Sequence, residues 1–264
     1  MPHIEKTAPG GFSWVELNTT DQNAAKTFYS KLFGWEILDS PMGPDEVYTM
    51  FSLEGRNTGA AATLRPEMKA AGVPPHWLLY INVASADEST EKVKAAGGQV
   101  FMGPFDVMTY GRMSAVADPA GASFCLWEDR DHSGFGITGV PGTLCWADLR
   151  TRDVEGASKF YSDVFGWKLI KDGRAETGTP EYLHIQNGEE MIGGMPPAEQ
   201  LPPGVPAHWG IYFYVTDCAA STEKAKALGA TVQMGPINIP HVGDMCLVAD
   251  PQGASFALFT PEKK

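Results

Sequence analysis

Hydrophobic and polar residues alternate in short runs along the chain, and these runs are grouped around helical stretches. Residues 14–18 alternate as a β-strand does, and residues 22–32 place apolar side chains at helical spacing after a capping Asp21. Gly34 ends this helix, because glycine favours the left-handed conformation of a helix C-terminus. Three shorter extended runs then follow, at residues 36–39, 48–53 and 59–64. The pattern therefore predicts a unit of one strand, one helix and three further strands.

The same order of elements recurs. Residues 76–83 predict a second opening strand, and Ser85 with Glu88 has capping-box spacing at the start of a helix that reaches Ala96. Three more extended runs follow it, at residues 99–102, 112–117 and 123–127. Four such units are expected, beginning near Phe12, His76, Leu144 and His208.

The second half of the chain repeats the first. Residues 28–35 return as 160–167, His76-Trp77 returns as His208-Trp209, and residues 118–124 return as 250–256, all at an offset of 132 residues (160 − 28). A fixed offset of half the 264-residue length indicates a tandem duplication. We expect one domain at residues 10–130, a polar, glycine-rich linker at 131–141 and a second domain at 142–262.

Composition narrows the class of protein. A hydrophobic content of 43% supports two ordinary cores, and no apolar run approaches the roughly 20 residues of a membrane helix. The net charge of −12, without a basic cluster, argues against nucleic acid and membrane partners. The N-terminus shows no signal segment, and the four cysteines form no Cys-x-x-Cys pair. We expect a cytoplasmic monomer or homodimer with reduced cysteines and a small-molecule ligand or substrate.

Several repeated motifs carry a family resemblance. They are the Phe-Tyr-x-x-x-Phe-Gly-Trp helix ends, the bends at Gly103-Pro104 and Gly235-Pro236, and the Asp-Pro-x-Gly turns at Asp118 and Asp250. In this order they resemble the vicinal oxygen chelate superfamily of glyoxalase I, extradiol dioxygenases and bleomycin and fosfomycin resistance proteins. Within it, the chain is most similar to two-domain, actinobacterial-type glyoxalase-like proteins, often labelled hydroxylases. The resemblance implies an α+β fold, a tandem repeat of two vicinal oxygen chelate domains whose four βαβββ modules form two cup-shaped half-barrels.

The resemblance also implies where a metal would bind. Metal-dependent members hold a divalent ion with His, Glu or Gln side chains that face into the cup. Here the matching places hold Trp14, Leu78 and Cys125 in the first domain and Trp146, Gly210 and Ala257 in the second, and residues 57–64 and 191–198 contain no His, Asp or Glu. We therefore expect no metal site of the usual kind and no cofactor. A displaced divalent site, for example with His184 and His241, remains an alternative.

Strand alternation predicts which side chains face the cups, because residues two apart share a face. In the first domain these are Phe12, Trp14, Glu16, Asn18, His76, Leu78, Tyr80 and Asn82; in the second they are Leu144, Trp146, Asp148, Arg150, His208, Gly210, Tyr212 and Tyr214. If the opening strands of a domain run antiparallel, as the family fold implies, Glu16 lies opposite His76 and Asp148 opposite His208. We predict two acid–histidine pairs in which the carboxylate favours the protonated imidazole. Each pair would act as a catalytic base or a polar anchor; alternatively, it only joins two strands, or the histidine donates to a backbone carbonyl.

Two classes of function fit these features. The first is metal-independent binding of a small aromatic or antibiotic-like molecule in an apolar cup. The ligand-binding residues would be Trp14, Tyr80, Cys125, Trp146, Arg150, Tyr212 and Tyr214, although the aromatic ones also suit a packed core. The second is an enzyme of the glyoxalase, dioxygenase or hydroxylase type that uses a displaced metal or the acid–histidine pair. A ligand-free interaction scaffold is a third possibility.

Overall fold

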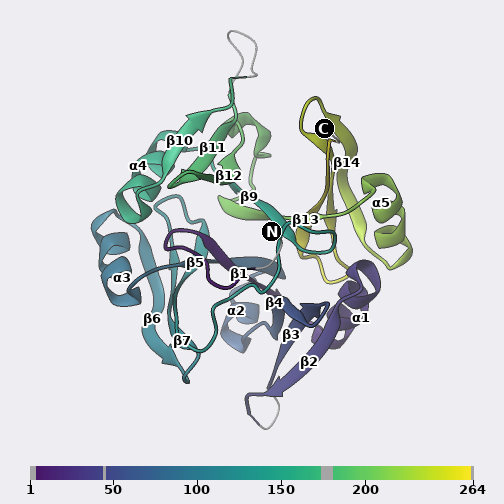
Figure 1. The fold of residues 1–264 in the computed structure, drawn as a ribbon, viewed down its shortest axis with the longest axis horizontal. Coiled ribbons are helices and arrows are strands. Elements are labelled where there is room, and N and C mark those ends of the chain that lie inside the picture. The colour runs from purple at the N-terminus through teal and green to yellow at the C-terminus, as the bar shows by residue number, and fades with distance from the viewer. Residues whose placement is uncertain (1–3, 44–45, 174–180, 263–264) are drawn as a thin grey trace.

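A computed structural model describes residues 4–43, 46–173 and 181–262. Each half of the chain forms one curved eight-stranded sheet, and the longer helices lie on the outer sides of the two sheets (Figure 1). The first half contains β1 (Phe12–Thr19), α1 (Gln22–Phe33), β2 (Glu36–Pro41), β3 (Val47–Leu53), β4 (Arg56–Thr63), α2 (Pro66–Ala70), β5 (His76–Asn82), α3 (Ala86–Ala95), β6 (Gln99–Val107), β7 (Gly111–Ala117) and β8 (Ser123–Asp129).

The second half repeats this order of elements. It contains β9 (Leu144–Arg150), α4 (Val154–Phe165), β10 (Lys168–Lys171), β11 (Leu183–Asn187), β12 (Glu190–Met195), the 3-10 helix η1 (Ala198–Gln200), β13 (His208–Tyr214), α5 (Cys218–Ala227), β14 (Thr231–Ile239), β15 (Gly243–Ala249) and β16 (Ser255–Pro261). The predicted tandem α+β architecture with two cup-shaped half-barrels is confirmed.

The strand order brings the inner faces of four strands together in each domain. The first sheet runs β2-β3-β4-β1-β5-β8-β7-β6, and the second runs β10-β11-β12-β9-β13-β16-β15-β14. The opening strands β1 and β5 are antiparallel at the centre, while β4 and β8 flank them in parallel. The concave face of the first sheet is called cup 1 below, and that of the second sheet cup 2.

Local signals position the helices as expected. Asp21 caps α1 by accepting a hydrogen bond from the Ala24 amide at 2.9 Å, and Ser85 caps α3 by accepting from the Glu88 amide at 3.2 Å. Gly34 ends α1 with a φ of 80°, a conformation that suits a residue without a Cβ. Among the helices of residues 4–262 that the structure describes, none is long and apolar enough to cross a membrane.

The two halves are joined by reciprocal buried contacts. The Tyr29 hydroxyl donates to the Asp250 carboxylate at 2.9 Å, and the equivalent Tyr161 hydroxyl donates to Asp118 at 3.2 Å. One hydrophobic core spans both halves, and α1 packs beside α5 and α3 beside α4 (Figure 1). The duplicated helices therefore meet across the domain interface.

The expected position of the Phe12 side chain is wrong. Phe12 was expected in cup 1, but a bulge between Phe12 and Trp14 shifts the alternation of β1. The Phe12 ring instead meets Trp167 and Trp209 edge-on in the shared core, with centroids 5.9 and 5.5 Å away. Pro66 begins the short helix α2, because proline suits a first helical turn.

Candidate functional site

Cup 1 is built around the carboxylate of Glu16, at the middle of β1. The Tyr80 hydroxyl donates to it at 3.1 Å and the Asn18 amide at 3.3 Å. Tyr48 also hydrogen-bonds this carboxylate, and the indole N–H of Trp14 donates to the Tyr48 hydroxyl at 3.3 Å. The groups that contact the Glu16 carboxylate are therefore uncharged hydrogen-bond donors.

Cup 2 repeats this arrangement around Asp148. The hydroxyls of Tyr182 and Tyr212 each donate to the Asp148 carboxylate at 2.6 Å, one to each oxygen. The Trp146 indole N–H lies within hydrogen-bond distance of both Asp148, at 3.1 Å, and the Tyr182 hydroxyl, at 2.7 Å. Arg150 donates to the Tyr212 hydroxyl at 3.0 Å, and so cup 2 contains a cation.

Each cup thus contains one tryptophan, one carboxylate and two tyrosines in matching places. Three of the matches follow the 132-residue offset, but Tyr48 and Tyr182 do not. In the strand pairings, Met50 and His184 occupy equivalent places, an offset of 134 residues (184 − 50). Tyr48 and Tyr182 do not match at the 132-residue offset for this reason and were not predicted as site residues; an alignment of the β2–β3 and β10–β11 hairpins could have found them.

Burial sets the protonation of these groups. Burial raises the pKa of Glu16, and hydrogen bonds from Tyr48, Tyr80 and Asn18 only partly offset this effect. Burial, together with the nearby Glu16 charge, also raises the pKa of Tyr48 and of Tyr80. The tyrosines are consequently neutral hydrogen-bond donors, and Glu16 is protonated more readily than an exposed glutamate.

The predicted direct acid–histidine pairs are wrong. In the register of β1 and β5, Glu16 lies opposite Leu78 and His76 lies opposite Asn18. The Nδ1 atom of His76 is 2.8 Å from the carbonyl oxygen of Pro74, which matches the alternative of a strand-end histidine that donates to the backbone. The antiparallel register pairs His76 with a residue two positions farther along β1 than was expected, and its catalytic role stays a prediction.

His208 behaves in the same way in the second domain. It lies opposite Arg150, and its Nδ1 atom is 2.9 Å from the carbonyl oxygen of Pro206. Burial lowers the pKa of His208, and the charge of Arg150 adds to this effect. The expectation that Asp148 would favour a protonated imidazole is therefore wrong for His208.

The other predicted ligand-binding residues occupy distinct places. Cys125 is fully buried in β8 beside Tyr80, and burial raises the pKa of its thiol. Tyr214 ends β13, where its backbone pairs with residues 142 and 143 of the segment that precedes β9. Arg150 and Tyr212 lie together in cup 2, as predicted from alternation.

The segment after β8 covers part of cup 1. The His132 ring meets the Trp14 ring edge-on, with centroids 4.8 Å apart, and the Phe135 ring lies 5.5 Å from Trp14. The Phe135 amide donates to the carbonyl oxygen of Ser13 at 2.8 Å, and the Trp127 indole donates to the His132 carbonyl at 2.9 Å. Trp14 is only 3% exposed as a result, and residues 132–135 close this side of cup 1.

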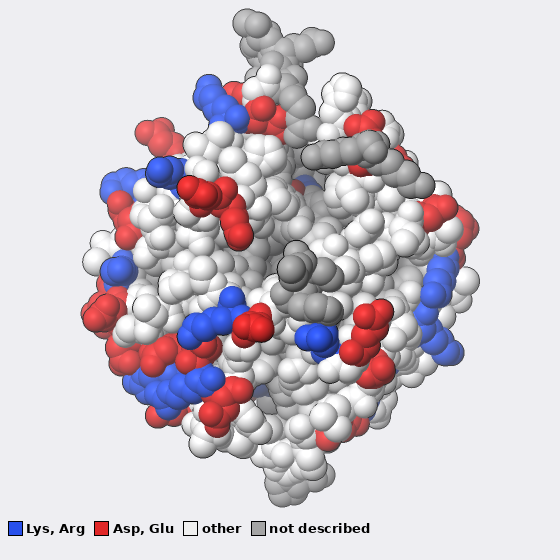
Figure 2. Space-filling view, in the orientation of Figure 1, with Lys and Arg blue, Asp and Glu red and all other residues white. Residues whose placement is uncertain are grey.

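Cup 2 leaves its tryptophan partly exposed. The Trp146 ring meets His184 edge-on at 5.9 Å, and His184 Nε2 lies 3.1 Å from an Asp172 carboxylate oxygen. Tyr182 lies directly over Gly194, where a Cβ atom would collide with the phenol. Figure 2 shows the surface hollowed between the β10–β12 and β14–β16 sides of domain 2, with acidic and basic atoms at the floor.

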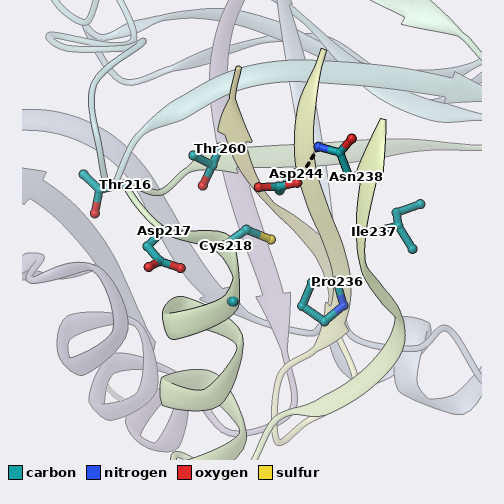
Figure 3. A pocket seen from close by; sticks show the side chains of 9 residues that line it. Thr216, Asp217, Cys218, Pro236, Ile237, Asn238, Asp244 and Thr260 are labelled. Atoms are coloured by element: carbon teal, nitrogen blue, oxygen red, sulfur yellow. Dashed lines mark hydrogen bonds between the residues drawn. The ribbon is translucent and has the colours of Figure 1, made fainter. Parts of the chain in front are cut away.

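A separate pocket of about 470 Å³ lies on the helix-covered side of domain 2 (Figure 3). It opens at the N-terminus of α5, beside Asp244, which accepts a hydrogen bond from Asn238 at 2.8 Å. In domain 1, Arg112 holds the place of Asp244 and forms ion pairs with Asp87 and Asp106, at 2.6 and 2.9 Å. This pocket has no aromatic lining, and we take the cups as the candidate site.

With this geometry in view, comparisons with known proteins identify the family. The sequence model of the Glyoxalase/Bleomycin resistance protein/Dioxygenase superfamily matches residues 11–126 and 143–258. The chain belongs to this superfamily, as the resemblance indicated. It is 40% identical to CFP32 of Mycobacterium tuberculosis, a protein with a glyoxylase name, over 99% of this chain and 98% of that protein.

The chain is also similar to a second relative in sequence and to a solved structure in fold. The chain is 34% identical to the anthracycline biosynthesis protein DnrV of Streptomyces peucetius, over 97% of this chain and 94% of DnrV. Its fold is similar to that of the Mn(II)-bound glyoxalase from Novosphingobium aromaticivorans, with a TM-score of 0.65 and 15% identity over 98% of this chain and 83% of that structure.

The residues of the cups do not fit a divalent metal held as the family holds it. The strand positions beside the two carboxylates are occupied by small or apolar residues, namely Ala60, Leu78, Gly194 and Gly210. The oxygens of Glu16 and Asp148 already accept hydrogen bonds from tyrosine and amide or indole donors. Across the part of the chain that the structure describes, no three His, Cys, Asp or Glu side chains converge as a metal site, and this includes His184 and His241.

Proposed function

We propose that this chain binds a small, planar aromatic molecule in a cup and does so without a resident metal. The observation that carries this proposal is the duplicated cluster of one tryptophan, one carboxylate and two tyrosines. The hydroxyl or indole N–H group of each of these aromatic side chains forms a hydrogen bond with another protein group. The rings are thus held in fixed orientations, and the partly exposed ring of Trp146 offers a flat apolar surface on which a ligand can stack.

The relatives support an aromatic ligand. DnrV carries the name of an anthracycline biosynthesis protein, and the two chains align over almost their full lengths. Anthracyclines are fused-ring aromatic compounds, and such a ligand suits a cup with a tryptophan at its edge. A ligand with a large apolar face would gain most of its binding free energy from burial of that face, at about 25 cal/mol per Å².

Binding of an anthracycline tests this proposal directly. Purified full-length protein, with and without a chelator, would be titrated with daunorubicin by isothermal titration calorimetry. We expect saturable binding that the chelator does not change and that Trp146→Ala weakens at least tenfold. Asp244→Asn, in the separate pocket at the N-terminus of α5, is the matched control and should bind daunorubicin as the unmodified chain does. Chelator-sensitive binding, or unaltered binding by Trp146→Ala, would reject the proposal.

An enzymatic function is the second candidate, and one observation favours it. Burial raises the pKa of Glu16 and so gives cup 1 a carboxyl group that keeps its proton to higher pH than an exposed glutamate and can act as a proton donor. A catalyst would change its ligand, whereas a binding protein would release it unaltered. Mass spectrometry of the recovered ligand after long incubation separates the two, since accumulation of a product that Glu16→Gln abolishes would establish the enzyme.

A further inference from the structure

The two cups differ most at two matching positions. Asn18 in cup 1 corresponds to Arg150 in cup 2, and Met50 corresponds to His184. The Asn18 amide is used within the protein, because it donates to Glu16. The two residues particular to cup 2 have hydrogen-bonding capacity to spare, and this difference indicates what cup 2 recognises.

Arg150 has unused donors. A guanidinium carries five N–H groups, and among the residues that the structure describes Arg150 donates to the Tyr212 hydroxyl. Its side chain extends past Gly210, which has no side chain to cover it, and it is partly exposed. The neighbouring carboxylate of Asp148 already balances the Arg150 charge. Arg150 is therefore suited to donate to a neutral acceptor, such as a carbonyl oxygen, and does not require an anion.

His184 has an unused acceptor. Its Nε2 atom faces the Asp172 carboxylate at 3.1 Å, and the ring proton is therefore placed on Nε2. Nδ1 of the neutral ring is then a hydrogen-bond acceptor. This atom is buried and meets no hydrogen-bond partner within the described part of the protein. A buried acceptor without a donor is unfavourable, and a ligand hydroxyl group would satisfy it.

The two groups lie within reach of one fused-ring molecule. His184 and Asp148 both pair with Gly194, one on each side, so they are two strand spacings apart, or about 10 Å. Arg150 follows two residues after Asp148 on the same face of β9, and the Trp146 ring lies against His184. A planar ligand lying across these strands would meet a donor, an acceptor and an aromatic surface.

We propose that cup 2, and not cup 1, is the ligand site and that it selects a neutral aromatic ketone or quinone that also carries a hydroxyl group. Arg150 donates to the carbonyl oxygen, and His184 Nδ1 accepts from the hydroxyl, while the Trp146 ring contacts the ring system. Cup 1 has neither group, and His132 and Phe135 cover its tryptophan. This inference rests on the proposed binding function and specifies its site and ligand class.

Three probes and two variants test each contact separately. The probes are 2-hydroxyanthraquinone, anthraquinone, which has no hydroxyl group, and 2-hydroxyanthracene, which has no carbonyl group. The variants Arg150→Asn and His184→Met introduce the residues that cup 1 has at the matching places. Met50→Leu in cup 1 is the matched control, and near-ultraviolet circular dichroism establishes that each variant is folded.

We expect 2-hydroxyanthraquinone to bind the unmodified chain at least tenfold more tightly than either truncated probe, about the effect of one hydrogen bond. His184→Met should remove the advantage of the hydroxyl group and leave anthraquinone binding unchanged. Arg150→Asn should weaken both quinones and leave 2-hydroxyanthracene unchanged. Met50→Leu should bind all three probes as the unmodified chain does.

Two outcomes would overturn the inference while the proposed function stands. One is binding of all three probes with equal affinity, and the other is a loss of binding in Met50→Leu but not in the cup 2 variants. If neither the probes nor daunorubicin bind the unmodified chain, the proposed function itself fails.

Discussion

Glu16 is a carboxyl group whose surroundings favour its protonated form. Burial raises its pKa above the ordinary value of 4.5, so the folded protein holds the proton more tightly than the unfolded chain. The stabilisation from this group is complete below pH 4.5 and is lost as the pH rises through the folded pKa. Glu16→Gln is neutral throughout. We expect the unfolding free energy of the unmodified chain, relative to Glu16→Gln, to fall as the pH rises from about 4 to about 8. Urea denaturation of both proteins at several pH values measures this difference in unfolding free energy. A difference that does not change with pH would contradict the expectation.

Gly194 gives Tyr182 the space it needs to reach Asp148. A Cβ atom at this position would collide with the phenol, so we expect Gly194→Ala to displace Tyr182 and break its hydrogen bond to the carboxylate. Loss of a hydrogen bond to a charged group costs about 1.5–3 kcal/mol. A double-mutant cycle with Tyr182→Phe provides the control. Gly194→Ala should lower the free energy of unfolding by less in the Tyr182→Phe background, because the hydroxyl that forms the hydrogen bond is absent there. Equal costs in both backgrounds would show that Tyr182 does not depend on Gly194.

The contents of the cups could be predicted from sequence only in part. Alternation correctly placed Glu16 and Asp148 inside, because a period of two is insensitive to neighbouring strands. Their partners depend on register, and a displacement of two residues in the pairing of β1 with β5 moved His76 away from Glu16. Tyr182 could not be found from the 132-residue offset, because the hairpin that carries it is longer than its counterpart.

At the scale of elements, the segment after β8 acts as the cover of cup 1. The Phe135 side chain is fully buried against Trp14. We expect Phe135→Ala to destabilise the protein by about 3–5 kcal/mol, the usual effect of removing a buried phenylalanine. Tyr110→Ala, at an exposed aromatic residue, is the control and should change stability little. Chemical denaturation measures both, and a cost below about 1 kcal/mol for Phe135→Ala would show that the segment is not packed as a cover.

Element boundaries show where local signals suffice. The helices were predicted closely, because Asp21, Ser85 and Gly34 specify their ends through local hydrogen bonds and backbone conformation. The strand β6 was expected to stop at Met102, before the Gly-Pro bend. It continues to Val107, because a register shift between Met102 and Phe105 lets the strand resume its pairing with β7 beyond the bend.

At the scale of the molecule, duplication provides matching surfaces that pack on one another. The repeat predicted two similar domains, but the contacts between them could not be predicted from alternation, because the pattern shows only that a face is apolar and not what covers it. Trp35 donates to the Gly142 carbonyl at 2.6 Å, and its counterpart Trp167 donates to the Gly10 carbonyl at 2.9 Å. The segments that precede β9 and β1 are thereby each fixed to the opposite half of the core.

The continuous core leads to an expectation about cooperativity. Tyr29 donates to Asp250 and accepts from the Trp77 indole at 3.1 Å, and both partners lie in buried surroundings. Tyr29→Phe leaves them unsatisfied and should cost about 1.5–3 kcal/mol, as should Tyr161→Phe at the equivalent contact. Because each substitution weakens an interface shared by both halves, we expect calorimetry to show one unfolding transition that moves to lower temperature in either variant, with equal calorimetric and van't Hoff enthalpies. Two separate transitions, of which each variant moves only one, would show that the halves unfold independently and that the buried tyrosine–aspartate contacts do not couple them.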